Sequence, residues 1–345
     1  MSIDSTAVRA LDAPEVLAAL AAELGDSLSA RALEVLSVQR LSGGAVQENW
    51  ALRLLVDGVR HAWVLRTDAP SAVGASLGRQ QEFAVLQRVH QAGVRVPRPV
   101  LMVEHSVALG RPYFLMECLG GIAAGHRLTR ERDALLDSDA LLDDLAATLA
   151  RLHGIEPVSG ELDFLSRPEG SPALAAIADY RRYLDTLAEP QPVLEWGLRW
   201  CERHVPPSLP LRLIHRDFRT GNYLVDHGRL SGVLDWEFTA FGDPREDLGW
   251  FSARCWRFAA PQREAGGIGD LSTFLDAYQR AGGIALAPAE LTYWQVMAHL
   301  RWGVIALQQA QRHLSGQERS LELALTGRLL PDLEIEILKL TREAP

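Results

Sequence analysis

Polar residues of the types used in catalysis are concentrated in one short stretch of the chain, residues 213–251. Apolar runs bounded by Gly and Asp interrupt them, which is the pattern of short strands and a hairpin. The runs are 213–214, 223–225 and 232–234. This pattern predicts that Asp217 and Asn222 lie on a loop before one strand and that Asp235 follows the end of the next strand.

Two carboxylates and an amide on neighbouring strand ends can hold Mg²⁺, because this ion prefers hard oxygen ligands and takes few of them from protein. Nucleotide phosphates and water fill the remaining positions. A further carboxylate beside them could take a proton from a hydroxyl group. The order His215-x-Asp217-x-x-x-x-Asn222, followed by Asp235 at a strand end, is the phosphoryl-transfer arrangement of protein kinases.

The surrounding residues differ from those of protein kinases. Asp235-Trp236-Glu237 replaces D-F-G, and Gly242-Asp243-Pro244 and Asp247-Leu248 follow at once, without room for an activation loop or an A-P-E motif. In the order and spacing of these motifs the chain resembles the aminoglycoside phosphotransferase family, within the kinase-like group that includes choline kinases. The resemblance implies an α+β, bilobal, protein-kinase-like fold. Its small β-rich N-lobe has one main helix, and its larger C-lobe is mostly helical.

The expected organisation has three parts: an N-terminal helical extension (1–36), a nucleotide-binding N-lobe (37–120) and a catalytic, acceptor-binding C-lobe (121–345). Leucines at helical spacing predict one or two helices over residues 12–36 that cover the first lobe. The main N-lobe helix is expected at 79–89. Beyond residue 251 we expect almost only helix, most clearly at 270–281 and 291–314.

The N-lobe residues are assigned from the resemblance. Gly43 and Gly44 lie between two predicted strands, where backbone amides can approach phosphates, and they match the loop that covers the nucleotide. Arg66 ends a strand at the position of the usual lysine, and arginine can bind phosphate through two parallel hydrogen bonds. Arginine at this position is familiar in one branch of the family, which includes kinase-like domains fused to acyl-CoA dehydrogenases.

Two further N-lobe assignments follow from the same resemblance. Glu82 would pair with Arg66 and fix its guanidinium group, although a solvent-exposed glutamate is an equally weighted alternative. The adenine edge would pair with the main chain between Glu117 and Leu119.

The C-lobe roles are also carried over position by position. Asp217 is the catalytic carboxylate, which orients the acceptor hydroxyl and accepts its proton. Asn222 and Asp235 bind Mg²⁺. His215 supports the catalytic loop through hydrogen bonds instead of acting as a base, and Asp247 anchors the backbone of that loop.

Composition limits the classes of partner. A net charge of −9 argues against a protein that binds nucleic acid by neutralising phosphates. Three scattered cysteines without CxxC spacing predict neither a disulfide framework nor a zinc site. No apolar stretch is long enough for a membrane span, and the N-terminus has no basic region of the kind that opens a secretory signal. We therefore expect a cytoplasmic protein. The oligomeric state stays open.

The predicted function is Mg²⁺-dependent transfer of the γ-phosphate of ATP or GTP to a hydroxyl of a small-molecule acceptor. One alternative is a catalytically idle, nucleotide-binding kinase-like protein, against which the joint presence of Asp217, Asn222 and Asp235 argues. A metal-dependent hydrolase ranks lower, because the chain lacks a His/Asp cluster of its own. The acceptor is left open: an acidic cleft would favour an aminoglycoside, whereas a mostly apolar cleft with basic rims would favour an acyl-CoA or a hydroxy acid. The Trp- and Leu-rich C-terminal region suits an acceptor with an apolar part.

Overall fold

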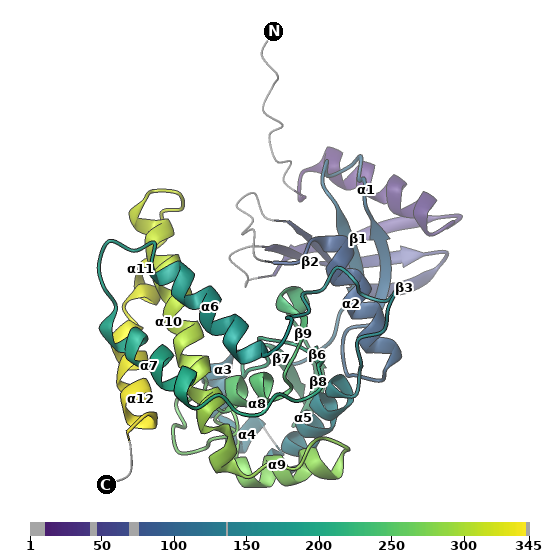
Figure 1. Ribbon diagram of the computed structural model, residues 1–345. Coiled ribbons are helices and arrows are strands. Elements are labelled where there is room, and N and C mark those ends of the chain that lie inside the picture. Colours follow the sequence, from purple (N-terminus) through teal and green to yellow (C-terminus); the bar gives the residue numbers. More distant parts are fainter. Residues whose placement is uncertain (1–10, 42–46, 69–75, 136, 343–345) are drawn as a thin grey trace. The chain divides into compact units, whose positions relative to one another are not determined.

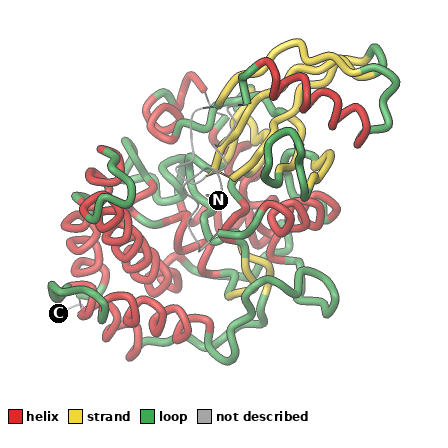
Figure 2. Tube along the Cα trace, turned by 90° about the horizontal axis from the view of Figure 1, so that it is seen from above, coloured by secondary structure: helices red, strands yellow, loops and turns green. Residues whose placement is uncertain are grey.

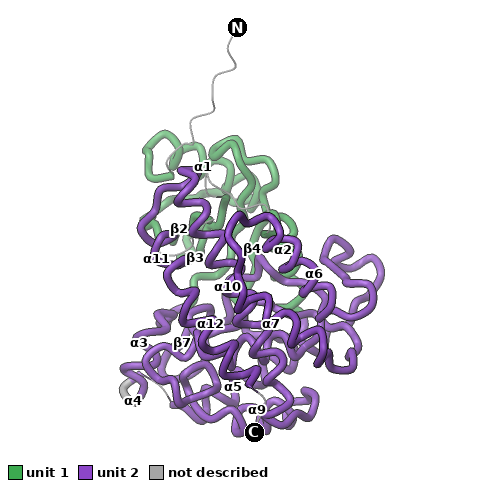
Figure 3. The backbone as a smooth tube through the Cα atoms, turned by 60° about the vertical axis from the view of Figure 1, so that its left-hand side comes forward, with its two compact units in different colours: residues 1–91, 96–119 green, residues 92–95, 120–345 purple. Residues whose placement is uncertain are grey.

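A computed structural model describes residues 11–41, 47–68, 76–135 and 137–342. The chain forms two compact units (Figure 3). Unit 1 comprises residues 1–91 and 96–119, and unit 2 comprises residues 92–95 and 120–345. Within the described ranges no helix combines the length and the apolar character needed to cross a membrane.

Unit 1 is built on an antiparallel sheet of five strands, seen in yellow in Figure 2. In spatial order the strands are β1 (Leu33–Arg40), β2 (Gln47–Val56), β3 (Val59–Asp68), β5 (Tyr113–Glu117) and β4 (Pro99–Val103). The hairpin between β2 and β3 turns at Asp57 and Gly58, both with positive φ, 48° and 82°. Two such residues in succession match the twist of the flanking strands.

Two helices pack on opposite faces of this sheet. Helix α1 (Pro14–Ser27) buries Leu20 and Leu24 in a core shared with Leu115 of β5. Helix α2 (Arg79–Gln91) packs on the other face, where the ring centroids of Phe83 and Phe114 are 5.7 Å apart. Neighbouring residues of a strand point to opposite faces of the sheet. Phe114 and Leu115 therefore lie in separate layers: Phe114 contacts α2, and Leu115 belongs to the core that α1 covers.

The helix predicted over residues 12–36 is wrong at its C-terminal end. Helix α1 ends at Ser27, and residues 33–36 begin β1. Leu33 and Val35 alternate with more exposed residues and pack against the core, which is a strand pattern too short to stand out beside the preceding leucines. The predicted boundary at residues 36 and 37 therefore lies inside a strand.

Unit 2 consists mostly of helices, drawn red in Figure 2. They are α3 (Gly125–Arg130), α4 (Arg132–Leu135), α5 (Ser138–His153), α6 (Pro172–Leu184), α7 (Pro192–Arg203), α8 (Arg245–Ser252), α9 (Leu271–Arg280), α10 (Thr292–Leu314), α11 (Leu321–Gly327) and α12 (Leu330–Leu340), with 3₁₀ turns at Trp236–Phe238, Arg254–Trp256 and Pro288–Leu291. Helix α10 contacts α6, α7, α8, α11 and α12 (Figure 1). The predicted helices at 270–281 and 291–314 are confirmed, and so is the α+β class.

Two short antiparallel ladders carry the motif residues of unit 2. Strand β6 (Arg212–Ile214) pairs with β9 (Ala240–Gly242), and β7 (Tyr223–Asp226) pairs with β8 (Arg229–Val233). Ile122 adds a bridge to Val225 through two hydrogen bonds of 2.8 and 3.0 Å. This approach requires glycine at position 121, where φ is +126° and a Cβ would lie 2.7 Å from the Val225 carbonyl oxygen.

Candidate active site

The loop of residues 215–222 connects β6 to β7, and a buried carboxylate holds its start. Asp247, on α8, accepts hydrogen bonds from the backbone N–H groups of His215 and Arg216, each at 2.7 Å. Its side chain is fully buried. Two charge-assisted hydrogen bonds to consecutive amides fix the direction in which the chain leaves β6. Asp247 thus lies where a loop anchor is expected, and its effect on activity stays a prediction.

A third partner completes the surroundings of Asp247. His153, the last residue of α5, lies 3.1 Å from Asp247 through Nε2 and 2.7 Å from the Tyr278 hydroxyl through Nδ1. Burial by itself raises the pKa of the Asp247 carboxyl, but the hydrogen bond and charge of His153, together with the hydrogen bond from the His215 backbone, outweigh this effect and hold that pKa below its usual value. His153 is therefore a buried helix-terminal histidine that also supports the loop anchor.

His215 connects the loop to the end of β8. Its Nε2 atom lies 2.8 Å from the Leu234 carbonyl oxygen and donates to it, whereas Nδ1 accepts the backbone N–H of Asp217 at 3.1 Å. These partners assign the neutral Nε2–H tautomer. Both ring nitrogens are engaged with the backbone, so His215 has no nitrogen left to take a proton from a substrate. Its hydrogen bonds fix the loop to the end of β8, which is a structural role.

The Asp217 carboxylate is oriented by three donors. Trp250 Nε1 donates to Oδ1 at 2.9 Å, Arg219 Nε donates to the same oxygen at 3.3 Å, and the Asn222 amide donates to Oδ2. The side chain is 15% exposed, so solvent still reaches it. Neither Trp250 nor Arg219 is predicted as a site residue from the sequence. Trp250 follows Asp247 by three residues on α8, and this spacing places both on one helix face.

Asn222 and Asp235 are brought to neighbouring backbone positions. Asn222 donates through Nδ2 to the backbone oxygen of Asp217 at 3.0 Å as well as to its carboxylate, which leaves its own Oδ1 as an acceptor. The N–H of Leu234 donates to the Asn222 carbonyl oxygen at 2.8 Å. Asp235 comes next, in the left-handed region (φ 60°), which Asp tolerates better than most residues. The strand ends predicted for these residues are the observed ones.

The strand register of unit 1 explains the position of Arg66. Arg66 is opposite Phe114 and Asn49 in the sheet and shares their face, on which α2 packs. Its Nε atom lies 3.0 Å from Glu82 Oε1, and both side chains are buried. Of the two alternatives for Glu82, the buried pair is therefore the one found. Glu82 also pairs with Arg79, which lies 2.9 Å from Asp68 and was missed by the sequence analysis.

We expect Glu82→Gln to destabilise the protein by about 3–5 kcal/mol, because it leaves the buried Arg66 and Arg79 without their shared negative charge. Urea unfolding followed by circular dichroism measures the change. Glu117→Gln is the matched control, since Glu117 is half-exposed and lies 3.8 Å from the exposed Arg98, a surface pair expected to contribute about 1 kcal/mol or less. Equal stability of the two variants would contradict the buried pair.

The other predicted nucleotide-binding residues lie in two places. Gly43 and Gly44 are outside the described residues. Glu117 ends β5, and the N–H groups of Glu117 and Cys118 donate to the carbonyl oxygens of Arg98 and Ala62. Leu119 makes no such bond through its N–H within the described part of the chain. Leu119 is thus the residue of this segment whose amide is left to donate to another group.

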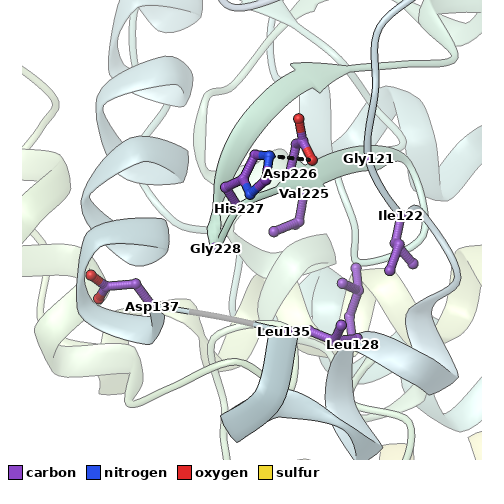
Figure 4. A pocket seen from close by; sticks show the side chains of 9 residues that line it. All are labelled: Gly121, Ile122, Leu128, Leu135, Asp137, Val225, Asp226, His227 and Gly228. Carbon is purple, nitrogen blue, oxygen red and sulfur yellow. Dashed lines mark ion pairs between the residues drawn. The ribbon is translucent and has the colours of Figure 1, made fainter.

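A pocket of about 460 Å³ opens at the turn between β7 and β8 (Figure 4). Ile122, Leu128 and Val225 give it an apolar wall, and Asp226 and His227 lie 3.9 Å apart at its turn. None of the predicted site residues lines it. The pocket therefore adds nothing to the arrangement around Asp217.

Comparison with known proteins gives one family and one fold. The model of the "Phosphotransferase enzyme family" matches residues 37–294. Among curated relatives, acyl-CoA dehydrogenase family member 11 of Pongo abelii is 24% identical over 292 residues, which cover 81% of this chain and 37% of the relative. The chain thus spans little more than a third of that relative's length.

Solved structures share the fold at low sequence identity. A candidate aminoglycoside phosphotransferase from Ralstonia eutropha matches with a TM-score of 0.74 and 19% identity, over 94% of this chain and 98% of the other. An aminoglycoside phosphotransferase in ternary complex with AMP-PNP and hygromycin B matches with a TM-score of 0.58 and 19% identity over the same shares. These TM-scores establish the shared kinase-like fold, whereas sequence identities this low leave the substrate open.

Proposed function

The chain belongs to the phosphotransferase enzyme family, and from this premise we propose that it transfers the γ-phosphoryl group of ATP or GTP to a hydroxyl of a small molecule. The observation that supports the proposal most directly is the set of hydrogen bonds that orients the Asp217 carboxylate and fixes its loop. Hydrogen bonds from Asn222 and Trp250 orient its carboxylate, and Asp247 and His215 fix the loop that carries it. A protein that only bound nucleotides would have no need of an oriented carboxylate at this position.

In the proposed reaction Asp217 acts on the acceptor. Phosphoryl transfer depends on in-line positioning and on charge stabilisation more than on covalent chemistry. The carboxylate aligns the acceptor hydroxyl and takes its proton as the new O–P bond forms, while the bond from the γ-phosphorus to the β,γ-bridging oxygen breaks and ADP or GDP leaves. Trp250 and Arg219 both donate to Oδ1 and Asn222 donates to Oδ2, so the carboxylate cannot rotate freely. This fixed orientation is what positions the acceptor oxygen for attack.

The donor set fits magnesium. The Asn222 amide oxygen and the Asp235 carboxylate are hard oxygen ligands, and Mg²⁺ takes few ligands from protein when phosphates and water supply the rest. No group of three or more His, Cys, Asp or Glu side chains that could hold a metal occurs within the described ranges, so these two residues would be the chain's contribution. When bound, the ion would neutralise charge on the transferred phosphoryl group.

The nucleotide side of the proposal rests on unit 1. Arg66 would supply the positive charge that a lysine supplies in protein kinases, and Glu82 sets the orientation of its guanidinium group. The N–H of Leu119 would donate to the adenine edge, since the amides of the two preceding residues are engaged in the sheet. The role of Gly43 and Gly44 in covering the phosphates stays a prediction from the sequence. A cytoplasmic location also stays a prediction from the sequence.

The proposal predicts a metal requirement that depends on Asp235. ATP or GTP consumption stimulated by a hydroxylated acceptor should require Mg²⁺ and stop when EDTA removes it. Asp235→Asn should lower turnover by about 100-fold or more and raise the Mg²⁺ concentration needed, because it removes a charged ligand. Asp226→Asn, an exposed aspartate at the end of β7, serves as the matched control.

The panel of acceptors should include aminoglycosides, macrolides, choline, sugars and hydroxyacyl thioesters. Turnover that persists in EDTA and in Asp235→Asn would contradict the metal assignment. Tight nucleotide binding without transfer to any member of the panel would favour the alternative of a catalytically idle protein.

A further inference from the structure

We infer that the acceptor of this enzyme carries an anionic oxygen group, a carboxylate or a phosphate, which Arg216 and Arg301 bind beside Asp217. The inference rests on the proposed function and names the class of substrate for the same site. It starts from a small pocket of unit 2 that α6, α8 and α10 enclose.

The pocket lies next to the Asp217 carboxylate. Trp250 forms part of its wall and donates through Nε1 to Asp217. Trp294, Met297 and Ala298 of α10 give it an apolar side. Its volume is about 20 Å³, which is room for one small group of a ligand and far too little for a whole amino sugar. The pocket is therefore suited to one end of an acceptor whose hydroxyl reaches Asp217.

The two arginines that line the pocket are fixed by different contacts. The backbone of Arg216 is held on both sides, since its N–H donates to Asp247 and its carbonyl oxygen accepts Nη1 of Arg301. Arg301 in turn stacks over the ring of Trp250, with its Cζ 4.5 Å from the ring centroid. The Arg301 guanidinium group is thus positioned by residues that also orient the loop and the carboxylate of Asp217. The backbone from which the Arg216 side chain extends is held at the same place.

Neither guanidinium has a carboxylate partner. In the described part of the chain, no Asp or Glu oxygen lies within ion-pair distance of Arg216 or Arg301. Arg216 and Arg301 are half-buried, whereas the buried Arg245 and Arg66 are both paired: Arg245 lies 2.6 Å from Asp243, and Arg66 lies 3.0 Å from Glu82. Burial, and then the charge of Arg216, lower the pKa of the Arg301 guanidinium below its usual value. An anion bound here would relieve both effects through charge-assisted hydrogen bonds.

One acidic residue, Glu246, also lines the pocket. Burial raises the pKa of its carboxyl, although Arg216 and Arg301 act in the opposite direction. Even when ionised, Glu246 would offset only one of the two positive charges, so the lining arginines keep an excess of positive charge. The Tyr180 hydroxyl, on the same pocket wall, can add a neutral donor. This balance favours an anion and disfavours a polycationic amino sugar.

The test compares acceptors that differ only in charge. Linear hydroxy acids of increasing chain length are assayed with their uncharged amides, with glycerol phosphate as the phosphate arm and with an aminoglycoside. We expect acceptor-stimulated nucleotide consumption with at least one anionic acceptor and about 10- to 100-fold lower kcat/KM with its uncharged analogue. Arg216→Gln should raise the KM for the anionic acceptor by a similar factor, so that the preference for the anionic acceptor over its uncharged analogue shrinks or disappears.

Arg182→Gln is the matched control, since Arg182 is an exposed arginine of α6 that pairs with the exposed Asp179. Calorimetric binding of the hydroxy acids and glycerol phosphate to the wild type and to Arg216→Gln separates binding from transfer. If the wild type binds the anions, Arg216→Gln does not, and no acceptor is phosphorylated, the anion subsite is supported and the proposed function is contradicted. Transfer to uncharged or cationic acceptors as fast as to anionic ones would keep the function and overturn the inference. Anion binding that is absent, or equal in Arg216→Gln, would also overturn it.

Discussion

Replacement of Asp217 by asparagine is expected to lower acceptor-stimulated phosphoryl transfer by about 10²- to 10⁴-fold, the range in which a positioned acid or base contributes to catalysis. Asparagine has nearly the same shape as aspartate but cannot accept the proton of the acceptor hydroxyl. Its side-chain oxygen can still receive the Trp250 indole N–H, which lies 2.9 Å from Oδ1. Its NH₂ group replaces the oxygen that accepts from Asn222, at a side chain that is 15% exposed and therefore reached by water. The loss should therefore fall on kcat, with little change in the folded structure.

Nucleotide binding is the readout that separates this role from a structural one. Arg66, Glu82 and Leu119 belong to unit 1, whereas Asp217 belongs to unit 2. Asp217→Asn should therefore bind ATP or GTP with an affinity within a few-fold of the wild type while transfer collapses. Asp226→Asn, the exposed aspartate on the next strand, should keep full turnover. Near wild-type kcat in purified Asp217→Asn would show that another group takes the proton.

The sequence was sufficient to predict the strands that flank the site residues, because each strand is indicated by a short run of neighbouring residues. Short apolar runs bounded by Gly and Asp gave the strands on both sides of Asp217, Asn222 and Asp235. The placement of Glu82 beside Arg66 could be proposed only through the family resemblance. The observed pair depends on register, because Arg66 faces α2 only when Phe114 is opposite it in the sheet.

The contacts that the sequence did not predict join residues far apart in the chain. Trp250 reaches Asp217 across 33 positions, and Arg301 reaches the Arg216 carbonyl oxygen across 85. A tryptophan or an arginine at helical spacing is usually a core or surface residue, so its type carries no signal of such a contact. The start of β1 was mistaken for helix for a related reason. Its partner is β2, and pairing between strands is not visible in either strand alone.

Asp247→Asn is expected to affect stability and activity together. In the wild type, two backbone N–H groups and His153 surround the buried carboxylate. An asparagine presents only one oxygen, so its NH₂ group faces one of these donors and leaves it unsatisfied. Loss of such a partner from a buried charge-assisted network costs about 3 kcal/mol or more. The loop from His215 to Asn222 loses its fixed start, and transfer should fall with it.

The dependence of stability on pH identifies the carboxylate itself. The folded state holds the pKa of Asp247 below its usual value, whereas an aspartate in an unfolded chain titrates near 3.9. The stabilisation is therefore complete above about pH 4 and is lost as the pH falls through the folded pKa. Asparagine does not titrate, so Asp247→Asn should lack this part of the acid destabilisation. The free energies of unfolding of wild type and variant should converge below about pH 4.

Urea unfolding between about pH 6 and pH 3, followed by tryptophan fluorescence, measures this difference. Of the nine tryptophans, all but Trp50 and Trp63 belong to unit 2, so the signal reports mainly on the unit that contains Asp247. Asp276→Asn, an exposed carboxylate on α9, is the control and should follow the wild type at every pH. A constant difference between wild type and Asp247→Asn across this range would contradict the anchor, because an ionised aspartate could then not be the source of the stabilisation.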